Sequence, residues 1–204
     1  MLVRRCGESA VLVEFDHLEL VLGLLRELRA QPPRGVRGLV PAARTLLVEF
    51  DPARVSFDAL VAELTTRPLA ATDSDTGEQV VLPVRYDGED LADVAARTGM
   101  DTREVVRRHT AAVYTVAFCG FAPGFGYLTG LDAALRLPRH DTPRTRVPSG
   151  SVGLAGEYTG VYPQASPGGW RIIGHTSATV WDTEADPPAL LVPGATVRFV
   201  EAAS

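Results

Sequence analysis

Apolar and polar residues follow two different periods along the first 66 residues, and each period predicts a different element. A period of two predicts three short strands, at Ala10–Phe15, Val36–Val40 and Thr45–Phe50. Between the first two strands, Leu18–Arg29 carries leucine and valine at the spacing of an amphipathic helix. Ser56 or Asp58 is placed to cap a second helix that ends near Thr66. This pattern predicts a small sheet with two helices, an α+β unit of the ferredoxin-like kind.

The periodic pattern stops at Arg67–Glu78, a polar stretch with few apolar residues. Such a composition is typical of a linker between domains. We therefore expect two domains, residues 1–77 and residues 78–204.

The second domain is expected to be rich in short strands. We predict them at Gln79–Tyr86, Val113–Cys119, Trp170–Ile173, Ala178–Trp181 and Thr196–Glu201. Glycine and proline separate these runs, and many short strands punctuated in this way are typical of a closed β structure.

Two short helices are predicted inside this domain, at Leu91–Thr98 and Thr102–Thr110, with Gly99 in the turn between them. This spacing resembles a DNA-binding helix-turn-helix. However, residues 89–108 carry five acidic side chains against four arginines, whereas a DNA-binding surface is positive. We expect no nucleic-acid partner.

Charge and backbone chemistry concentrate in Phe118–Thr176. The chain has a net charge of −5, yet this segment holds five arginines against three acids. It also holds 11 of the 19 glycines and 6 of the 15 prolines, together with many aromatic residues. We interpret it as ordered, tightly turned loops that present arginine to an anion, because the planar guanidinium binds carboxylate or phosphate through two hydrogen bonds.

The residue types also exclude several chemistries. All 20 basic residues are arginine, so a lysine Schiff base and the lysine of a phosphate-binding loop are excluded. The four histidines show no metal-ligand spacing, and no metal site is expected. No apolar run is long enough to cross a membrane and the N-terminus lacks a signal-peptide pattern, so we expect a cytoplasmic protein without a membrane partner.

Two residues are our candidates for catalysis. His175 follows the apolar run Trp170–Gly174, and histidine is the side chain that exchanges protons near neutral pH. Arg144 lies between Pro143 and Pro148, whose rings restrict the backbone and help to preset the direction of the guanidinium.

A family resemblance follows from long glycine- and proline-rich motifs. These are GFAPGFGYL, the Pro-Arg pairs at 138–139 and 143–144, VPSGSVGLAG, TGVYP, SPGGW and IIG-x-T. Together they closely resemble the family that contains the B subunit of 5-oxoprolinase, allophanate hydrolase subunit 1 and the kinase-inhibitor protein of sporulating bacilli, and the resemblance covers nearly all 204 residues. Two positions depart from that pattern, Gly126 in place of proline and His175 in place of arginine.

The resemblance implies an N-terminal ferredoxin-like domain followed by a cyclophilin-like β-barrel domain. It also implies two partners, a homologous C subunit that is similar to allophanate hydrolase subunit 2, and the A subunit of 5-oxoprolinase. Together these subunits would open the lactam of 5-oxoproline to glutamate at the expense of ATP, and this chain would be inactive alone. The motifs supply a set of expected substrate-binding residues: His109, Phe121, Gly124, Phe125, Tyr127, Arg139, Ser149, Ser151, Thr159, Tyr162, Ser166, Gly168, Gly169 and Trp170.

Two alternatives share the same sequence pattern. One is a carboxyltransferase-type subunit related to urea carboxylase and allophanate hydrolase. The other is a regulatory protein that binds and inhibits a sensor histidine kinase.

Overall fold

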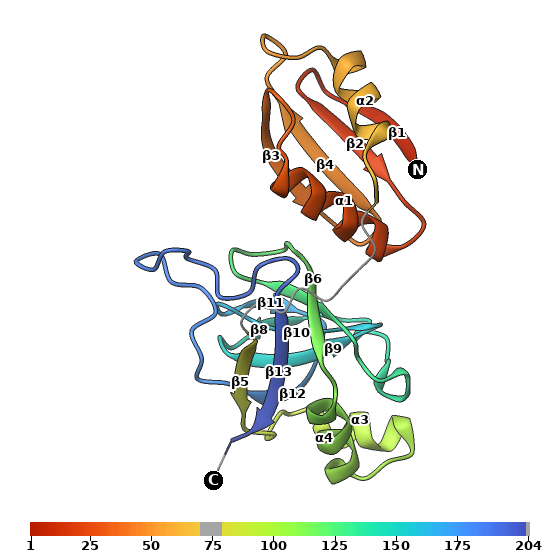
Figure 1. Cartoon of the computed structure of the whole chain (residues 1–204). Coiled ribbons are helices and arrows are strands. Elements are labelled where there is room, and N and C mark those ends of the chain that lie inside the picture. Colours follow the sequence, from red (N-terminus) through yellow and green to blue (C-terminus); the bar gives the residue numbers. More distant parts are fainter. Residues whose placement is uncertain (70–78, 203–204) are drawn as a thin grey trace. The chain divides into compact units, whose positions relative to one another are not determined.

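The computed structural model describes residues 1–69 and 79–202, which form two compact units, Met1–Asp75 and Thr76–Ser204 (Figure 1). The predicted boundary between residues 77 and 78 lies outside the described residues, as does most of the predicted linker.

The first unit is a four-stranded antiparallel sheet with two helices. Its strands are β1 (Leu2–Cys6), β2 (Ala10–Glu14), β3 (Val36–Pro41) and β4 (Thr45–Phe50), in the order β1-β2-β4-β3. The helices are α1 (Leu18–Ala30) and α2 (Phe57–Thr66). Ser56 is the N-cap of α2, and its hydroxyl accepts a hydrogen bond of 3.3 Å from the amide of Ala59. The α+β class and the three predicted strands are confirmed, and β1 is an additional strand.

The core of this unit lies between the sheet and its helices. One face of the strands contributes Val11, Val13, Leu46, Val48 and Phe50. The helices contribute Val21, Leu24, Leu25, Leu28, Leu60 and Leu64. Strand residues two apart share one face of a sheet, and the helix residues recur at three- and four-residue spacing, so the sequence periods account for this core.

The second unit is built on a seven-stranded sheet that nearly closes into a barrel. The strand order is β12-β9-β10-β7-β6-β13-β5. The strands are β5 (Val80–Val84), β6 (Tyr114–Cys119), β7 (Gly126–Thr129), β9 (Ser151–Ala155), β10 (Tyr158–Val161), β12 (Arg171–His175) and β13 (Thr196–Glu201). Strands β8 (Arg144–Val147) and β11 (Ser166–Gly168) form a separate pair.

The two ends of the seven-stranded sheet meet at a single bridge. Arg85, just after β5, and His175, at the end of β12, exchange two backbone hydrogen bonds of 2.8 Å. This bridge joins the first and last strands of the sheet, which confirms the predicted closed β structure.

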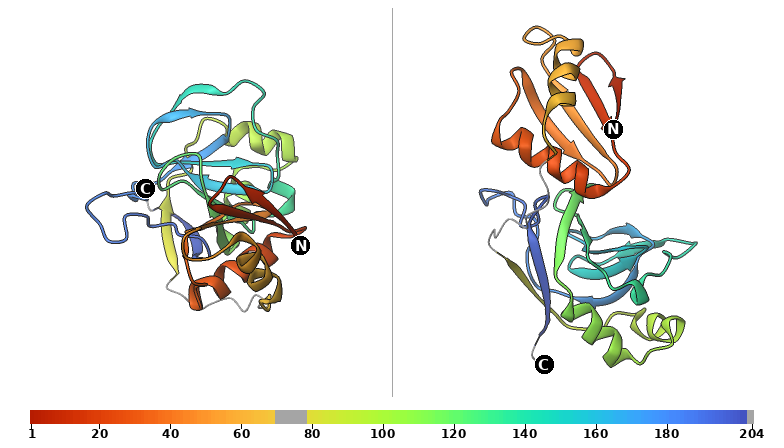
Figure 2. Two further views of the ribbon diagram at one scale, coloured as in Figure 1. Left: turned by 90° about the horizontal axis from the view of Figure 1, so that it is seen from above. Right: turned by 45° about the vertical axis from the view of Figure 1, so that its right-hand side comes forward.

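Two short helices, α3 (Leu91–Thr98) and α4 (Thr102–Ala111), lie together at one end of the barrel (Figure 2). Gly99 ends α3 with a positive φ of 70°, and the Asp101 carboxylate caps α4 by accepting a hydrogen bond of 2.7 Å from the Glu104 amide. Both predicted helices are confirmed. A 3₁₀ turn, η1 (Ala133–Leu135), follows β7.

One predicted strand is wrong. Ala178–Trp181 is irregular, and its regular pairing is limited to an isolated bridge between Trp181 and Ala189. The prolines at 187 and 188 follow closely, and proline cannot donate to a ladder of strand hydrogen bonds.

The interior of the barrel is mostly apolar. Its largest buried side chains include Tyr114, Phe199, Leu82, Leu128 and Leu154. A smaller cluster of Phe125, Val147, Tyr162 and Ile172 packs β8 against the main sheet. Within residues 1–69 and 79–202, no helix combines the length and the apolar character needed to cross a membrane.

Candidate functional site

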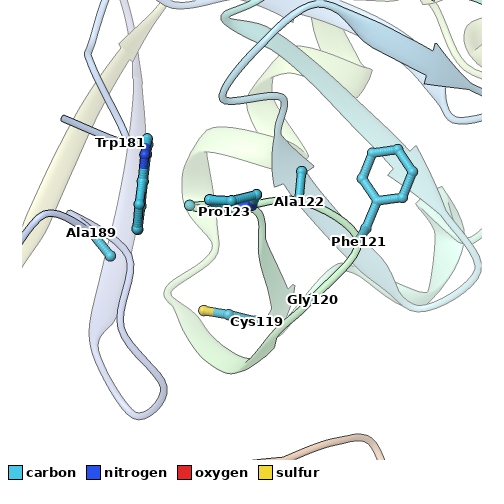
Figure 3. A pocket seen from close by; sticks show the side chains of 8 residues that line it. Cys119, Gly120, Phe121, Ala122, Pro123, Trp181 and Ala189 are labelled. Atoms are coloured by element: carbon cyan, nitrogen blue, oxygen red, sulfur yellow. The ribbon is translucent and has the colours of Figure 1, made fainter. Parts of the chain in front are cut away.

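The loop between β6 and β7 forms one wall of a hollow of about 450 Å³. Cys119–Gly124 line one side of the hollow, and Trp181 and Ala189 line the other, as Figure 3 shows. Gly124 has a φ of +80°, and a Cβ there would lie 2.5 Å from the Cβ of Trp181. Glycine is therefore required for the close approach of the two walls.

Phe121 stands at the tip of this loop in a strained conformation. Its φ of 69° lies in the left-handed region. Among the residues described, Phe121 is the one non-glycine residue with a positive φ. The side chain is 62% exposed, and in Figure 3 its ring points away from Trp181. Backbone strain of this kind is concentrated at functional sites, so the loop is the first part of the candidate site.

A second hollow, of about 270 Å³, is lined by hydroxyl groups and backbone. Its lining residues are Ser149, Gly150, Tyr162, Pro163 and Thr176–Val180. The Ser149 hydroxyl donates to the Pro163 carbonyl at 2.9 Å. Among the described residues, no charged side chain lines this hollow, so its chemistry suits a small molecule that exchanges neutral hydrogen bonds.

An aromatic layer connects the two hollows. Phe121 lies edge-to-face against Phe125 and Tyr162, with ring centroids 5.4 and 6.3 Å apart. Phe125 in turn contacts Tyr127 and Trp170. The structure thus brings five of the predicted substrate-binding residues, all aromatic, into one layer, with Phe121 lining the first hollow and Tyr162 the second.

Arg144, a predicted catalytic residue, is held by protein groups. Its Nη2 lies 2.6 Å from Asp90 and its Nε 2.8 Å from Glu89, and its Nη1 donates to the Trp170 carbonyl at 3.3 Å. The side chain lines neither hollow. In this structure Arg144 fixes the position of β8 beside the loop that carries Trp170.

Asp90 is the centre of that arrangement. Its side chain is 7% exposed, and its carboxylate accepts hydrogen bonds from Arg144 and, at 2.6 Å, from the amide of Ile172 on β12. His140 Nε2 lies 3.2 Å from the same carboxylate. A buried carboxylate needs such partners to remain charged, and the sequence offered no signal for them because they are 50 to 82 residues away.

His175, the other predicted catalytic residue, is partly exposed at the barrel bridge. Its Nδ1 lies 2.9 Å from Oδ1 of Asp87, and the second carboxylate oxygen pairs with Arg85. The hydrogen bond from His175, together with Arg85, lowers the pKa of Asp87. His175 and Arg144 pair with different carboxylates, Asp87 and Asp90, and the side chain of His175, like that of Arg144, lines neither hollow.

His109 lies inside the barrel, with no exposed surface. Its Nδ1 is 2.8 Å from the Tyr86 hydroxyl and its Nε2 is 3.0 Å from the Thr159 hydroxyl, which itself donates to the Gly153 carbonyl at 3.1 Å. Because Thr159 uses its proton on Gly153, it accepts from Nε2–H, and Nδ1 accepts from Tyr86. Burial lowers the pKa of His109 to about 3, so the ring is neutral near pH 7.

The remaining predicted residues line neither hollow. Ser151 is completely buried, as are His109 and Thr159, and none of the three lines a hollow. Gly168 approaches the Tyr162 ring so closely that a Cβ would lie 2.3 Å from its hydroxyl oxygen. Arg139 lies near Tyr127, Ser166 begins β11, and Gly169 accepts a backbone hydrogen bond of 2.7 Å from His140.

Three residues of this region were absent from the prediction: Asp87, Asp90 and Trp181. Asp87 and Asp90 stand on either side of Gly88 and Glu89, and that short acidic turn after a strand was the available signal. No group of three or more His, Cys, Asp or Glu side chains suited to a metal occurs in the part of the chain that the structure describes.

Comparison with known proteins gives one family and several named relatives. Residues 1–191 match the family described as carboxyltransferase domain, subdomain C and D. The protein named as the B subunit of 5-oxoprolinase in Escherichia coli O157:H7 is 51% identical, over 59% of this chain and 57% of that protein. The Bacillus subtilis protein with the same name is 35% identical, over 97% of this chain and 91% of that protein. The match to the E. coli protein thus spans little more than half of its length.

Solved structures agree with the fold. TTHA0988 superposes with a TM-score of 0.83 at 39% identity, covering 100% of this chain and 40% of that one. The uncharacterized protein PH0987 from Pyrococcus horikoshii gives a TM-score of 0.60 at 36% identity, covering 98% and 97% of the two chains. The Kluyveromyces lactis urea carboxylase gives 0.71 at 23% identity, with 98% of this chain and 22% of that one covered, which shows a shared fold.

Proposed function

This chain belongs to the family of carboxyltransferase domains, subdomains C and D, and from that membership we propose that it is the B subunit of a 5-oxoprolinase. The observation that carries the proposal is the set of relatives with that name, which includes a B. subtilis protein matched over 91% of its length. The family that the motifs predicted is the family that the comparison finds.

The proposed reaction opens the cyclic amide of 5-oxoproline to glutamate, driven by ATP hydrolysis, in a cytoplasmic complex with the A and C subunits. Opening an amide ring requires donors that stabilise negative charge on the carbonyl oxygen and a group that moves a proton. The hydroxyl-lined hollow next to Tyr162 is of a size for a small polar substrate. We place the lactam ring there, leave the carboxylate of 5-oxoproline to a charged group outside this lining, and assign proton transfer to His175, whose side chain lines neither hollow.

In our proposal neither hollow holds ATP. The first is lined by Cys119–Gly124, Trp181 and Ala189, and the second by neutral hydroxyls and backbone. A triphosphate is usually held by Arg, Lys or a metal ion, and within the described ranges no charged side chain lines either hollow. In our proposal, therefore, another subunit holds ATP, and this chain shows no substantial turnover alone.

The finer fold assignments form part of the same proposal. A ferredoxin-like unit has the element order β-α-β-β-α-β, whereas the first unit reads β-β-α-β-β-α. We propose that β1 occupies the sheet position of the last ferredoxin strand, because β1 pairs antiparallel with β2 at that edge. We assign the closed sheet of the second unit to the cyclophilin-like barrels.

The experiment is co-expression of this chain with candidate A and C subunits, followed by purification and an assay for glutamate release. We expect ATP-dependent release from 5-oxoproline and none from a preparation that lacks ATP. A second arm offers urea and biotin-linked carboxyl groups, because a urea amidolyase from Lachancea kluyveri is 26% identical over 96% of this chain. Turnover in the second arm alone would assign the chain to the carboxyltransferase alternative. If neither arm gives turnover and the chain inhibits a sensor histidine kinase, the regulatory alternative is correct.

A further inference from the structure

The turn after β5 is clamped onto β12. The Gly88 amide donates to the Ile173 carbonyl at 3.2 Å, and the Asp90 amide donates to the Ile172 carbonyl at 2.9 Å. A Cβ at Gly88 would lie 2.3 Å from the Ile172 carbonyl oxygen. The backbone on both sides of Asp87 is thus fixed against the strand that carries His175, so the carboxylate of Asp87 is held in place by more than its own hydrogen bonds.

The hydrogen bond between Asp87 and His175 has one possible direction. Arg85 and His175 both lower the pKa of Asp87, so its carboxylate is ionised near neutral pH and can only accept hydrogen bonds. Nδ1 of His175, 2.9 Å away, must then carry the proton. A neutral His175 ring in this position has its lone pair on Nε2.

Nε2 of His175 is also accessible. The side chain is 33% exposed, and Nε2 has no hydrogen-bond partner in the described part of the chain. His109 and His140 differ from it: both ring nitrogens of His109 are engaged in the barrel interior, and His140 shares its carboxylate with Arg144. A carboxylate on one ring nitrogen and an open second nitrogen is the arrangement of a histidine general base.

We propose that Asp87 is a positioning residue that holds His175 as the Nδ1–H tautomer, so that Nε2 of His175 accepts the proton of the attacking water in ring opening. This inference rests on the proposed function. The water oxygen forms a bond to the amide carbon while its proton passes to Nε2. The carbon–nitrogen bond then breaks, the electron pair stays on nitrogen, and the imidazolium returns the proton to that nitrogen. Asp87 stabilises the imidazolium between the two steps.

The tautomer is measured on the full chain by nitrogen-15 NMR of labelled histidine. The chain has four histidines, so single substitutions assign each ring. We expect the Nδ1–H form at His175 in the wild type and a shift toward the Nε2–H form in Asp87→Ala, with Glu184→Ala, an exposed acid of the same unit, unchanged. An Nε2–H ring in the wild type, or a ring that Asp87→Ala leaves unaltered, overturns the proposal.

The role of the tautomer is measured in the assembled complex. We expect His175→Gln to lower kcat by about 100-fold and Asp87→Ala by about tenfold, with KM nearly constant. His17→Gln, an exposed histidine of the first unit, serves as the control. Wild-type kcat in a folded His175→Gln complex overturns the proposal even when 5-oxoproline is hydrolysed.

Chemical modification of histidine separates this inference from the proposed function. Diethyl pyrocarbonate modifies neutral, accessible imidazole nitrogen, and mass spectrometry locates the product on the isolated chain. We expect His175 to react faster than His140 and His109, and Asp87→Ala to slow the reaction severalfold. An unreactive His175 overturns the base assignment, whereas a wild-type complex without 5-oxoproline turnover, combined with a reactive His175, overturns the proposed function alone.

Discussion

At the scale of single residues, Arg144 is a structural connector. Its guanidinium reaches Asp90, Glu89 and the Trp170 carbonyl at once. The planar guanidinium has several donors that make these contacts together, whereas a lysine ammonium offers one point charge. Removing the guanidinium leaves Asp90, a buried carboxylate, with fewer partners.

We therefore predict that Arg144→Lys lowers the free energy of unfolding by about 1–3 kcal/mol. Denaturant unfolding monitored by tryptophan fluorescence measures the change. Arg146→Lys, an exposed neighbour on the same strand, is the control and should leave the midpoint unchanged. An Arg144→Lys protein with wild-type stability but impaired turnover would return Arg144 to the catalytic role that the sequence suggested.

His109 makes folding sensitive to acid. Its pKa in the folded chain is lowered to about 3 by burial, so the unfolded chain binds the proton first as pH falls below the ordinary histidine value of about 6.5. The stability that the neutral ring contributes is fully present above that value and is lost as pH falls toward 3.

We predict that His109→Gln removes this part of the acid sensitivity. A glutamine amide has a donor group and an acceptor group, as the neutral ring does, but it does not titrate. Between pH 7 and pH 5 the wild type should lose about 2 kcal/mol more unfolding free energy than the variant. Urea unfolding at both pH values gives the comparison, and parallel losses in the two proteins would show that His109 is not the titrating group.

The candidate site was only partly predictable from these residues. The aromatic and glycine positions of the site were visible because they stand in the motifs themselves, as Phe121, Gly124 and Tyr162 do. Asp87 and Asp90 were not identified. Their short acidic turn was visible, but most of the groups that hold their carboxylates lie 50 to 88 residues away, and short-range patterns carry no information about such partners. His109 was predicted to bind substrate, but its side chain is buried. The barrel closes around this residue, and the sequence motif alone does not show that burial.

At the scale of elements, the sequence predicted best where one face of an element is buried. Helices α1 to α4 and strands β2 to β4 follow their apolar periods. Strand β1 (LVRRC) is mostly exposed and carries two arginines, so it lacks an alternating pattern and was missed. Strands β7 to β11 are three to five residues long, and all but β8 contain glycine, so they lack the alternating pattern of a longer strand.

The bridge that closes the barrel depends on Gly174. A Cβ at this position would lie 2.6 Å from the Arg85 carbonyl oxygen and 2.8 Å from Val84 Cγ1. An added methyl group must push the two strands apart at the point where β5 and β12 meet.

We predict that Gly174→Ala lowers the unfolding free energy by about 1–3 kcal/mol and selectively speeds hydrogen exchange at the amides of Arg85 and His175. The control is Gly120→Ala, because the nearest atom to a Cβ there is 3.9 Å away. Unchanged exchange at both amides in Gly174→Ala would mean that the bridge does not hold the barrel closed.

At the scale of the whole molecule, the two units have separate cores. The apolar cluster of the first unit includes Leu46 and Phe50, and the clusters of the second begin with Leu82. Both tryptophans, Trp170 and Trp181, lie in the second unit. Tryptophan fluorescence therefore reports the second unit by itself.

We predict that Leu46→Ala, which empties a fully buried site, destabilises the first unit by about 2–5 kcal/mol and leaves the tryptophan transition in place. Circular dichroism should then show an earlier transition that fluorescence does not follow. Coincident shifts of both signals would show that the units unfold as one.

The central claim, that this chain is a necessary part of a 5-oxoprolinase, is tested most directly by adding it in increasing amounts to fixed amounts of the A and C subunits with 5-oxoproline and ATP. The claim predicts no substantial glutamate release without this chain and a rate that rises with its concentration until a fixed molar ratio is reached. The same rate with and without the chain, or full turnover by the chain alone, would contradict it.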